Sequence, residues 1–190
     1  MVRRWQEKIN RLAVLSTVGI TATLTASIPT SVLASPPPEL ERLEYFEGSW
    51  DCQQPADNQE PSGKFTRNVK RDLNDFWYLG STAQTVIPDD GKPINSQEFL
   101  GYDVAAQQLI NSVVVSNGNS YTVAADDWQD SKLVWEGTIS MGERSSPLRK
   151  EIVQDSAAKF TATYFVPSPD GGWQPIVNES CDRNFQGSDN

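Results

Sequence analysis

The chain has 190 residues, no histidine, and 25 Asp and Glu against 16 Lys and Arg, which gives a net charge of −9 at pH 7. Such an acidic protein repels nucleic acids and anionic lipid surfaces, so we expect neither as a partner. Without imidazole the commonest general base at neutral pH is missing, and catalytic triads built on Ser–His or Cys–His are excluded.

Residues 1–34 are predicted to be a signal peptide. A basic start that includes Arg3 and Arg4 precedes an uncharged stretch over residues 12–28, and Val32-Leu33-Ala34 offers small residues for cleavage. A transmembrane anchor is the alternative, but Thr and Ser interrupt the stretch. We therefore expect an exported protein, in the periplasm, an equivalent oxidising lumen or the extracellular space, whose mature form does not associate with membranes.

Residues 35–47 are predicted to be an extended lead-in followed by a short helix. Three consecutive prolines stiffen the lead-in. Leu40, Leu43 and Phe46 then recur at helical spacing over residues 39–46, and Gly48 stops the helix. A helix in this place would cover one end of a sheet or barrel.

Residues 48–185 are predicted to be strand after strand, with a polar tail over residues 186–190. Turn signals such as Asn117-Gly118-Asn119 separate the strands, and no long helical pattern intervenes. About ten strands in one open sheet would leave exposed edges, so the expected fold is all-β, a closed up-and-down antiparallel barrel. The predicted strands cover residues 49–54, 64–73, 76–87, 94–102, 107–116, 120–125, 132–141, 148–155, 159–167 and 173–182.

The two cysteines, Cys52 and Cys181, fall on the first and last predicted strands, which are neighbours in a closed barrel. In an exported protein two thiols most often form one structural disulfide. Free or metal-binding thiols are the alternative, but two Cys without any His supply too few ligands for zinc. The acidic run at residues 126–130 lacks the glycine and distal Glu of a calcium loop, so we expect no metal site.

Several motifs resemble a known family. The Gly48-Ser49-Trp50 step resembles the opening of lipocalin-type (calycin) barrels, and the order of motifs along the mature chain resembles the bacterial family DUF1579. The resemblance implies a closed barrel whose interior holds a small molecule, with Gly48 and Trp50 as structural residues, and it implies no catalytic residues. Related nitrobindin-like barrels hold heme through a histidine, which this chain lacks, so we expect no cofactor. The matching stretches are residues 43–50, 71–79, 99–103, 133–137 and 170–183.

One predicted strand carries arginines on a face that also carries apolar residues. Phe65, Arg67, Val69, Arg71 and Leu73 share that face by alternation. If it points inward, two guanidinium groups enter an apolar cavity and demand partners, and a spare arginine would clamp the carboxylate of a fatty-acid-like ligand. The alternative is that Lys64, Thr66 and Asn68 face a solvated lumen. The candidate partners are Glu98, Glu136 and Glu151.

Aromatic residues spread over six predicted strands form a second candidate feature. They would stack on a hydrophobic ligand in the lumen, although packing is the usual role of an aromatic in a strand. Trp50 is expected to plug the barrel floor under the helix. The candidate ligand-binding residues are Arg67, Arg71, Trp77, Glu98, Tyr102, Trp135 and Tyr164.

Three functions remain open from the sequence. The first is an exported barrel that binds a small hydrophobic or amphipathic molecule. The second is an acidic structural or assembly protein that docks a basic protein partner. The third is an isomerase or cyclase that uses carboxylates in the lumen, although no phosphate-binding, nucleophile-elbow or paired-His motif supports an enzyme.

Overall fold

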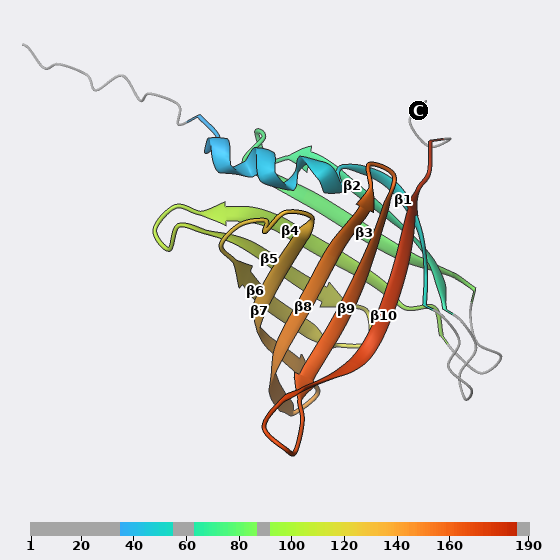
Figure 1. Ribbon diagram of the computed structural model, residues 1–190. Coiled ribbons are helices and arrows are strands. Elements are labelled where there is room, and N and C mark those ends of the chain that lie inside the picture. Colours follow the sequence, from blue (N-terminus) through green and yellow to red (C-terminus); the bar gives the residue numbers. More distant parts are fainter. Residues whose placement is uncertain (1–34, 55–62, 87–91, 186–190) are drawn as a thin grey trace, which may run out of the picture. The chain divides into compact units, whose positions relative to one another are not determined.

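The computed structural model describes residues 35–54, 63–86 and 92–185. In this part of the chain a single antiparallel sheet closes on itself in the order β1-β10-β9-β8-β7-β6-β5-β4-β3-β2, so each strand pairs with its sequence neighbours and the first pairs with the last (Figure 1). This confirms the predicted all-β, up-and-down barrel of ten strands with a short helix before it. The predicted signal peptide and the polar tail lie outside the described residues.

The strand bounds agree closely with those predicted from turn signals. The largest difference is at β8, which begins four positions earlier than predicted because Gly142, with φ of 60°, makes a tight turn directly after β7. β2 ends before Leu73, whose φ of 52° is left-handed. The strands are β1 (Gly48–Gln53), β2 (Lys64–Asp72), β3 (Trp77–Val86), β4 (Asn95–Asp103), β5 (Gln108–Val115), β6 (Ser120–Ala125), β7 (Lys132–Met141), β8 (Arg144–Ser156), β9 (Lys159–Pro167) and β10 (Trp173–Arg183).

The barrel closes at the seam between β1 and β10. The register places Cys52 directly opposite Cys181, with their Cα atoms 4.0 Å apart, and the two residues form a disulfide. Both cysteines are almost fully buried. The bond therefore links the two ends of the sheet on its inner face, as the sequence predicts.

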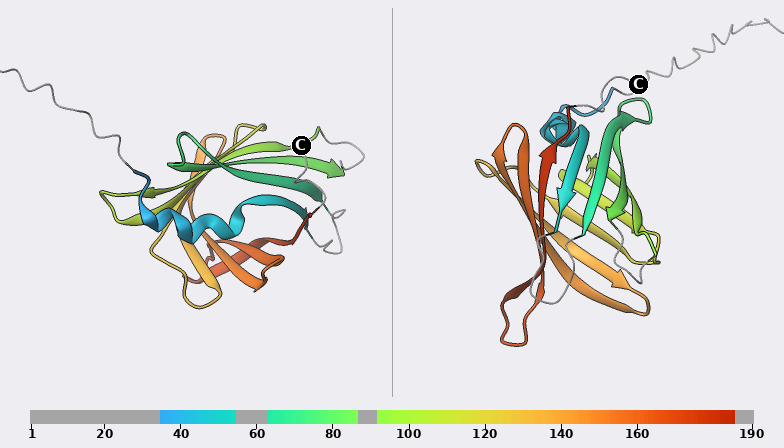
Figure 2. Two further views of the ribbon diagram at one scale, coloured as in Figure 1. Left: turned by 90° about the horizontal axis from the view of Figure 1, so that it is seen from above. Right: turned by 90° about the vertical axis from the view of Figure 1, so that its right-hand side faces the viewer.

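The helix η1 (Pro38–Phe46) is a 3-10 helix. Leu40, Leu43 and Phe46 recur every three residues, which is the period of this helix, so all three lie on one face and are buried. Seen from above, η1 crosses one end of the barrel (Figure 2). Its apolar face closes that end, which we call the closed end.

Arg183 at the end of β10 fastens η1 to the barrel. Its guanidinium donates hydrogen bonds to the carbonyl oxygens of Tyr45 (2.7 Å) and Glu47 (2.5 Å) and lies 4.2 Å from the ring centre of Trp50. Trp50 donates in turn from Nε1 to the carbonyl of Phe46 at 2.9 Å. Gly48 has φ of +114°, and a Cβ there would lie 2.9 Å from Arg183 Nη1, so this contact needs a glycine. Gly48 and Trp50 thus fix the helix over the closed end.

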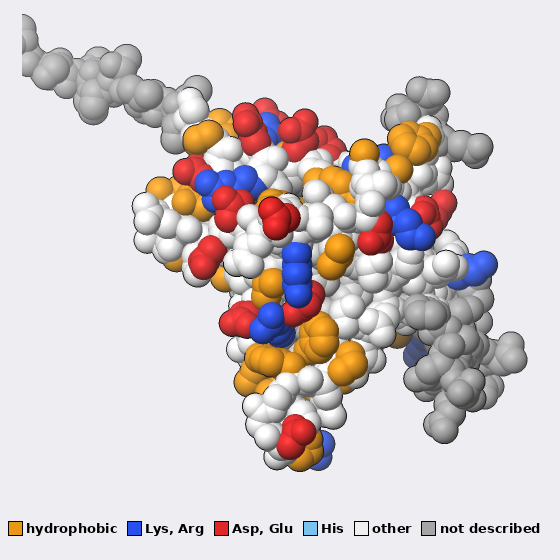
Figure 3. Space-filling model, viewed as in Figure 1, with side chains coloured by type: hydrophobic (Ala, Val, Ile, Leu, Met, Phe, Trp, Pro, Cys, Tyr) orange, Lys and Arg blue, Asp and Glu red, His pale blue; other side chains and the backbone are white. Residues whose placement is uncertain are grey.

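The outer surface is charged with both signs. Carboxylates of η1 gather over the closed end, and acidic and basic side chains are interspersed on the strands below (Figure 3). Glu136 and Glu151 lie on this outer face, where both pair with Arg149, and Glu151 also pairs with Lys132. These two glutamates are therefore not partners of an inward arginine. Glu151 shares its face of β8 with Val153, and the inner face carries Ile152 instead.

Candidate functional site

A cavity of about 310 Å³ occupies the half of the barrel away from η1. Every strand from β2 to β10 contributes to its lining, because alternate residues of each strand point inward. Apart from the ionisable residues and tyrosines, the lining has more apolar than polar side chains, and its polar members are Gln54, Thr82, Gln84, Ser96, Asn119 and Ser120. The apolar lining residues are Phe65, Ile94, Val113, Val115, Ile139, Leu148, Ile176 and Val177.

Ionisable groups form the floor of this cavity. Two cations and two carboxylates come together there from four strands, with two tyrosine hydroxyls between them. Below them the interior is filled by the aromatic core of the closed end, which includes Phe46, Trp50 and Phe160. The cavity floor, a term we use for these six residues, consists of Arg67, Glu98, Tyr121, Lys150, Tyr164 and Glu179.

Arg67 and Glu98 form a buried ion pair with 2.5 Å between Nη2 and Oε2. Asn111 donates from Nδ2 to the other carboxylate oxygen at 2.7 Å. Burial disfavours the ionised carboxylate, but Arg67, Lys150 and Asn111 outweigh it and hold the pKa of Glu98 below its usual value. Gly80 gives this carboxylate room, because a Cβ there would lie 2.8 Å from Oε2.

The Arg67 guanidinium rests on the aromatic core. Its centre lies 5.6 Å from the ring of Phe46 and 5.9 Å from the ring of Phe160. Its Nε is buried and has no hydrogen-bond partner within the described part of the chain. The strand pattern left two orientations open for Arg67; the structure has the inward one, and the charge that balances it is Glu98.

Lys150 is the second cation of the floor and is only 2% exposed. Its Nζ lies 3.4 Å from the hydroxyl of Tyr121, and 5.7 and 5.3 Å from the ring centres of Tyr121 and Tyr164. None of the ion pairs among the described residues involves it. Burial, partly offset by Glu98, lowers the pKa of Lys150 to about 8. Part of its population is therefore the neutral amine near neutral pH.

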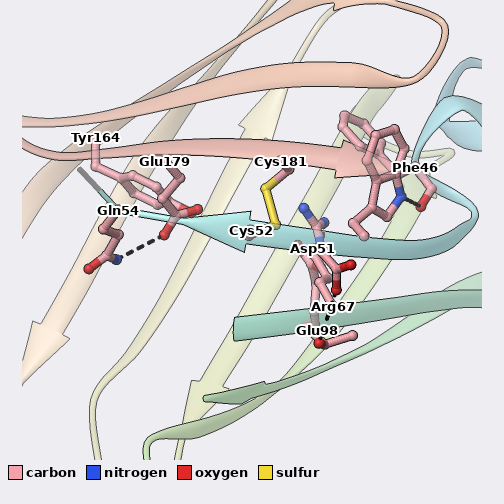
Figure 4. The surroundings of a disulfide bond; sticks show 11 residues. Phe46, Asp51, Cys52, Gln54, Arg67, Glu98, Tyr164, Glu179 and Cys181 are labelled. Atoms are coloured by element: carbon pink, nitrogen blue, oxygen red, sulfur yellow. Dashed lines mark hydrogen bonds and ion pairs between the residues drawn. A yellow bond between two sulfur atoms is a disulfide. The ribbon is translucent and has the colours of Figure 1, made fainter. Parts of the chain in front are cut away.

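Glu179 stands beside the disulfide on β10. It accepts hydrogen bonds from Nε2 of Gln54 (3.3 Å) and from the hydroxyl of Tyr164 (3.4 Å), and neither donor is charged. Figure 4 shows this group on one side of the Cys52–Cys181 bond, with Arg67 of β2 and Glu98 of β4 on the other side. Burial raises the pKa of Glu179. The floor thus holds one strongly paired carboxylate and one that favours its proton.

The structure brings together only some of the candidate ligand-binding residues. Arg67, Glu98 and Tyr164 line the cavity. Arg71 lies toward the closed end, where its Nε donates to the hydroxyl of Tyr78 at 2.9 Å. The other three candidates, Trp77, Tyr102 and Trp135, do not line the cavity.

Trp135 belongs to the packed core, and the partly buried Tyr102 packs against that core. Trp77 lies across from Gly101 on the adjacent strand, and its ring covers that glycine on the outer face, where a Cβ would lie 2.5 Å from the indole. The absence of a side chain at Gly101 is what gives this indole its place outside the barrel.

Sequence reasoning missed Lys150, Tyr121 and Glu179. The signal that could have found Lys150 was the alternation Leu148-x-Lys150-x-Ile152. The strand face that carries Lys150 has two large aliphatic residues, whereas the opposite face has only one valine. Glu179 had no such signal, because β10 is irregular near Pro175 and its alternation shifts there.

The described residues form neither a metal site nor a membrane-spanning helix. No group of three or more Asp, Glu or Cys side chains in this part of the chain is placed to hold a metal ion. None of its helices has the length and apolar character needed to cross a bilayer.

Comparisons with known proteins agree with the fold. The solved structure of Rv2717c from M. tuberculosis superposes with a TM-score of 0.57 at 11% identity, covering 79% of this chain and 99% of that one. A redesigned β-barrel matches with a TM-score of 0.38 at 11% identity, covering 74% and 93% of the two chains. Among curated proteins nothing matches significantly. The family model described as "Protein of unknown function (DUF1579)" matches residues 35–183, so the chain belongs to the DUF1579 family.

Proposed function

We propose that the protein binds one small hydrophobic or amphipathic molecule inside its barrel. The observation that carries this proposal is a cavity with apolar walls and a floor of hydrogen-bonding groups. Ligand pockets in proteins have this composition, with a few polar groups that fix the orientation of a mostly apolar ligand.

The arrangement suggests which way the ligand lies. An apolar chain would contact Phe65, Val115 and Leu148 in the walls, while a polar head would reach the tyrosine hydroxyls and Lys150 at the floor. The cavity volume of about 310 Å³ is at the low end of the range of about 300–1,000 Å³ found for small-molecule pockets. One short ligand therefore fills it.

We further infer that the protein acts after export. The disulfide between Cys52 and Cys181 supports an oxidising compartment, because thiols are kept reduced in most cytosols. The basic and then uncharged N-terminal sequence supports the same conclusion. Location of the native protein by cell fractionation tests this point: recovery in the cytosolic fraction would contradict it.

Titration with octanol, followed by intrinsic tryptophan fluorescence and by native mass spectrometry, tests the binding. Val115→Trp places an indole in the cavity and is expected to weaken binding at least tenfold. Val114→Trp is the matched control, because Val114 is the next residue on β5 and is 53% exposed on the outer face. Equal binding by both variants, or no binding by the unmodified protein, would contradict the proposal.

A further inference from the structure

We propose that Lys150 captures the carbonyl group of an apolar aldehyde in the cavity by forming a reversible imine. This inference rests on the proposed function and names the chemical class of its ligand. It assigns Lys150 as the residue that forms a covalent bond, with Tyr121, Tyr164 and Glu179 around it.

The surroundings of Lys150 favour a reactive amine over a structural cation. A structural lysine in a protein interior is normally paired with a carboxylate. Lys150 Nζ has instead one long hydrogen bond, to Tyr121, and two aromatic faces beside it. It lines the cavity, so a ligand entering from the mouth meets it at the floor.

The charges of the floor distinguish a carbonyl ligand from an anionic one. A fatty-acid carboxylate near Lys150 would also lie near Glu98 and Glu179, where ionised Glu98 repels it and Glu179 would have to keep its proton. An aldehyde brings no charge to the floor. The iminium ion that it forms carries one positive charge, and the same two carboxylates stabilise that charge. We therefore favour the carbonyl.

The reaction balances with groups that are present. The neutral amine of Lys150 attacks the carbonyl carbon and forms a C–N bond, and one amine proton moves to the oxygen to give a carbinolamine. Protonated Glu179 gives its proton to the Tyr164 oxygen, 3.4 Å away, while the Tyr164 hydroxyl proton passes to the departing hydroxyl group. The C–O bond breaks, water leaves, and an iminium ion remains beside the carboxylate of Glu179. Hydrolysis by water reverses each step.

Burial supplies the neutral amine that this step needs. With a pKa of about 8, roughly a tenth of Lys150 is neutral at pH 7, against about 0.04% of an ordinary lysine of pKa about 10.4, a difference of about 200-fold. The groups that face it are Glu98 on β4, Glu179 on β10, Arg67 on β2, and the tyrosines of β6 and β9. The rate of the first step, attack by the amine, should therefore rise up to about pH 8 and then level off.

Reductive trapping tests the inference. The purified protein with its disulfide intact is incubated with octanal and cyanoborohydride at pH 7, and peptide mapping locates the added octyl group. We expect it on Lys150 at least tenfold more than on Lys132 or Lys159, which are half-exposed on the outer face. Octyl groups distributed evenly over the lysines, or confined to the α-amino group, would overturn the inference. This readout uses the unmodified protein and so does not depend on the folding of a variant.

Two further measurements separate the carbonyl from other heads. Lys150→Arg keeps the charge without a nucleophilic amine, and it is expected to lose the trapped adduct. If octanol binds to the unmodified protein but octanal gives no adduct, the carbonyl inference fails and the proposed function stands. If octanoate binds more than tenfold tighter than octanol, the site is an anion site and the inference fails too. If none of the three binds, both proposals fail.

Discussion

Replacing Glu98 with glutamine should destabilise the barrel more than any other single change of a charged residue on the cavity floor. The substitution keeps the size of the side chain but removes the charge that balances Arg67. The side chains of Arg67 and Glu98 are 9% and 6% exposed, so water cannot replace the lost partner. Arg67 stays charged without Glu98, because a guanidinium is effectively always protonated in proteins.

The size of the effect follows from the geometry. Two unit charges about 4 Å apart at an effective dielectric constant of about 20 attract by about 4 kcal/mol. Removing one partner of a buried pair costs about 3–5 kcal/mol in other proteins, because the remaining charge is left buried. We therefore expect Glu98→Gln to lower the free energy of unfolding by about 3–5 kcal/mol. The double variant Arg67→Met/Glu98→Leu should recover most of this loss.

Urea unfolding of the oxidised protein, followed by tryptophan fluorescence, measures these values. Glu136→Gln is the control, because Glu136 pairs with Arg149 at 3.4 Å on the outer face and its side chain is 60% exposed. Such an exposed pair contributes less than about 1 kcal/mol. If Glu98→Gln lowers the free energy of unfolding by no more than Glu136→Gln does, the Arg67–Glu98 pair is not desolvated. The cavity floor would then not be a buried ionic site.

Three other changes follow from single contacts. Replacing Cys52 and Cys181 together with alanine should lower the free energy of unfolding by up to about 5 kcal/mol, because the disulfide closes a loop of 129 positions. Calorimetry measures this loss. An unchanged Tm would contradict the expectation. Gly137→Ala should cost about 1–3 kcal/mol or more, since its Cβ would lie 2.1 Å from the carbonyl oxygen of Thr122. Gly172→Ala, whose Cβ meets nothing nearer than 3.9 Å, is its control. The pKa of Lys150 is about 8 in the folded protein and 10.5 for the free side chain. Between pH 8 and pH 10.5 the unfolded state therefore binds more protons than the folded state. Because of this difference, the free energy of unfolding should rise with pH over that range. Lys150→Met should remove that rise and be up to about 3 kcal/mol more stable at pH 7, as pH-dependent urea unfolding can show.

The fold could be predicted because its signals are local. Each hairpin carries its own turn residues, and each strand its own alternation, so the strand bounds could be placed without knowledge of long-range contacts. The cysteines then identified which strands meet at the seam. The type of the helix could also have been predicted, because Leu40, Leu43 and Phe46 are separated by three residues each time.

The cavity floor was harder to predict because it depends on which side of each strand faces inward. In β2 the face of Phe65, Arg67 and Val69 is the more apolar one, and the inward position of Arg67 follows. In β8 both faces mix charged and aliphatic residues, and the face of Lys150 exceeds that of Glu151 by only one aliphatic residue, so the local pattern is a weak guide. Only the pairing with β7 and β9 fixes the choice. A one-residue shift exchanges the two faces of a strand, which is why side-chain direction is predicted less well than the strand itself.

Closure of the barrel must wait for nearly the whole chain, since the two cysteines that meet at the seam are 129 positions apart. Contacts between such distant residues slow folding, and we expect refolding times of about milliseconds to seconds. Until β10 docks, β1 and β9 present unpaired backbone groups that invite association with other chains. The carbonyls of Tyr45 and Glu47 likewise lack their donor until Arg183 arrives. The earliest-made segment of the barrel domain is thus among the last to acquire its native contacts.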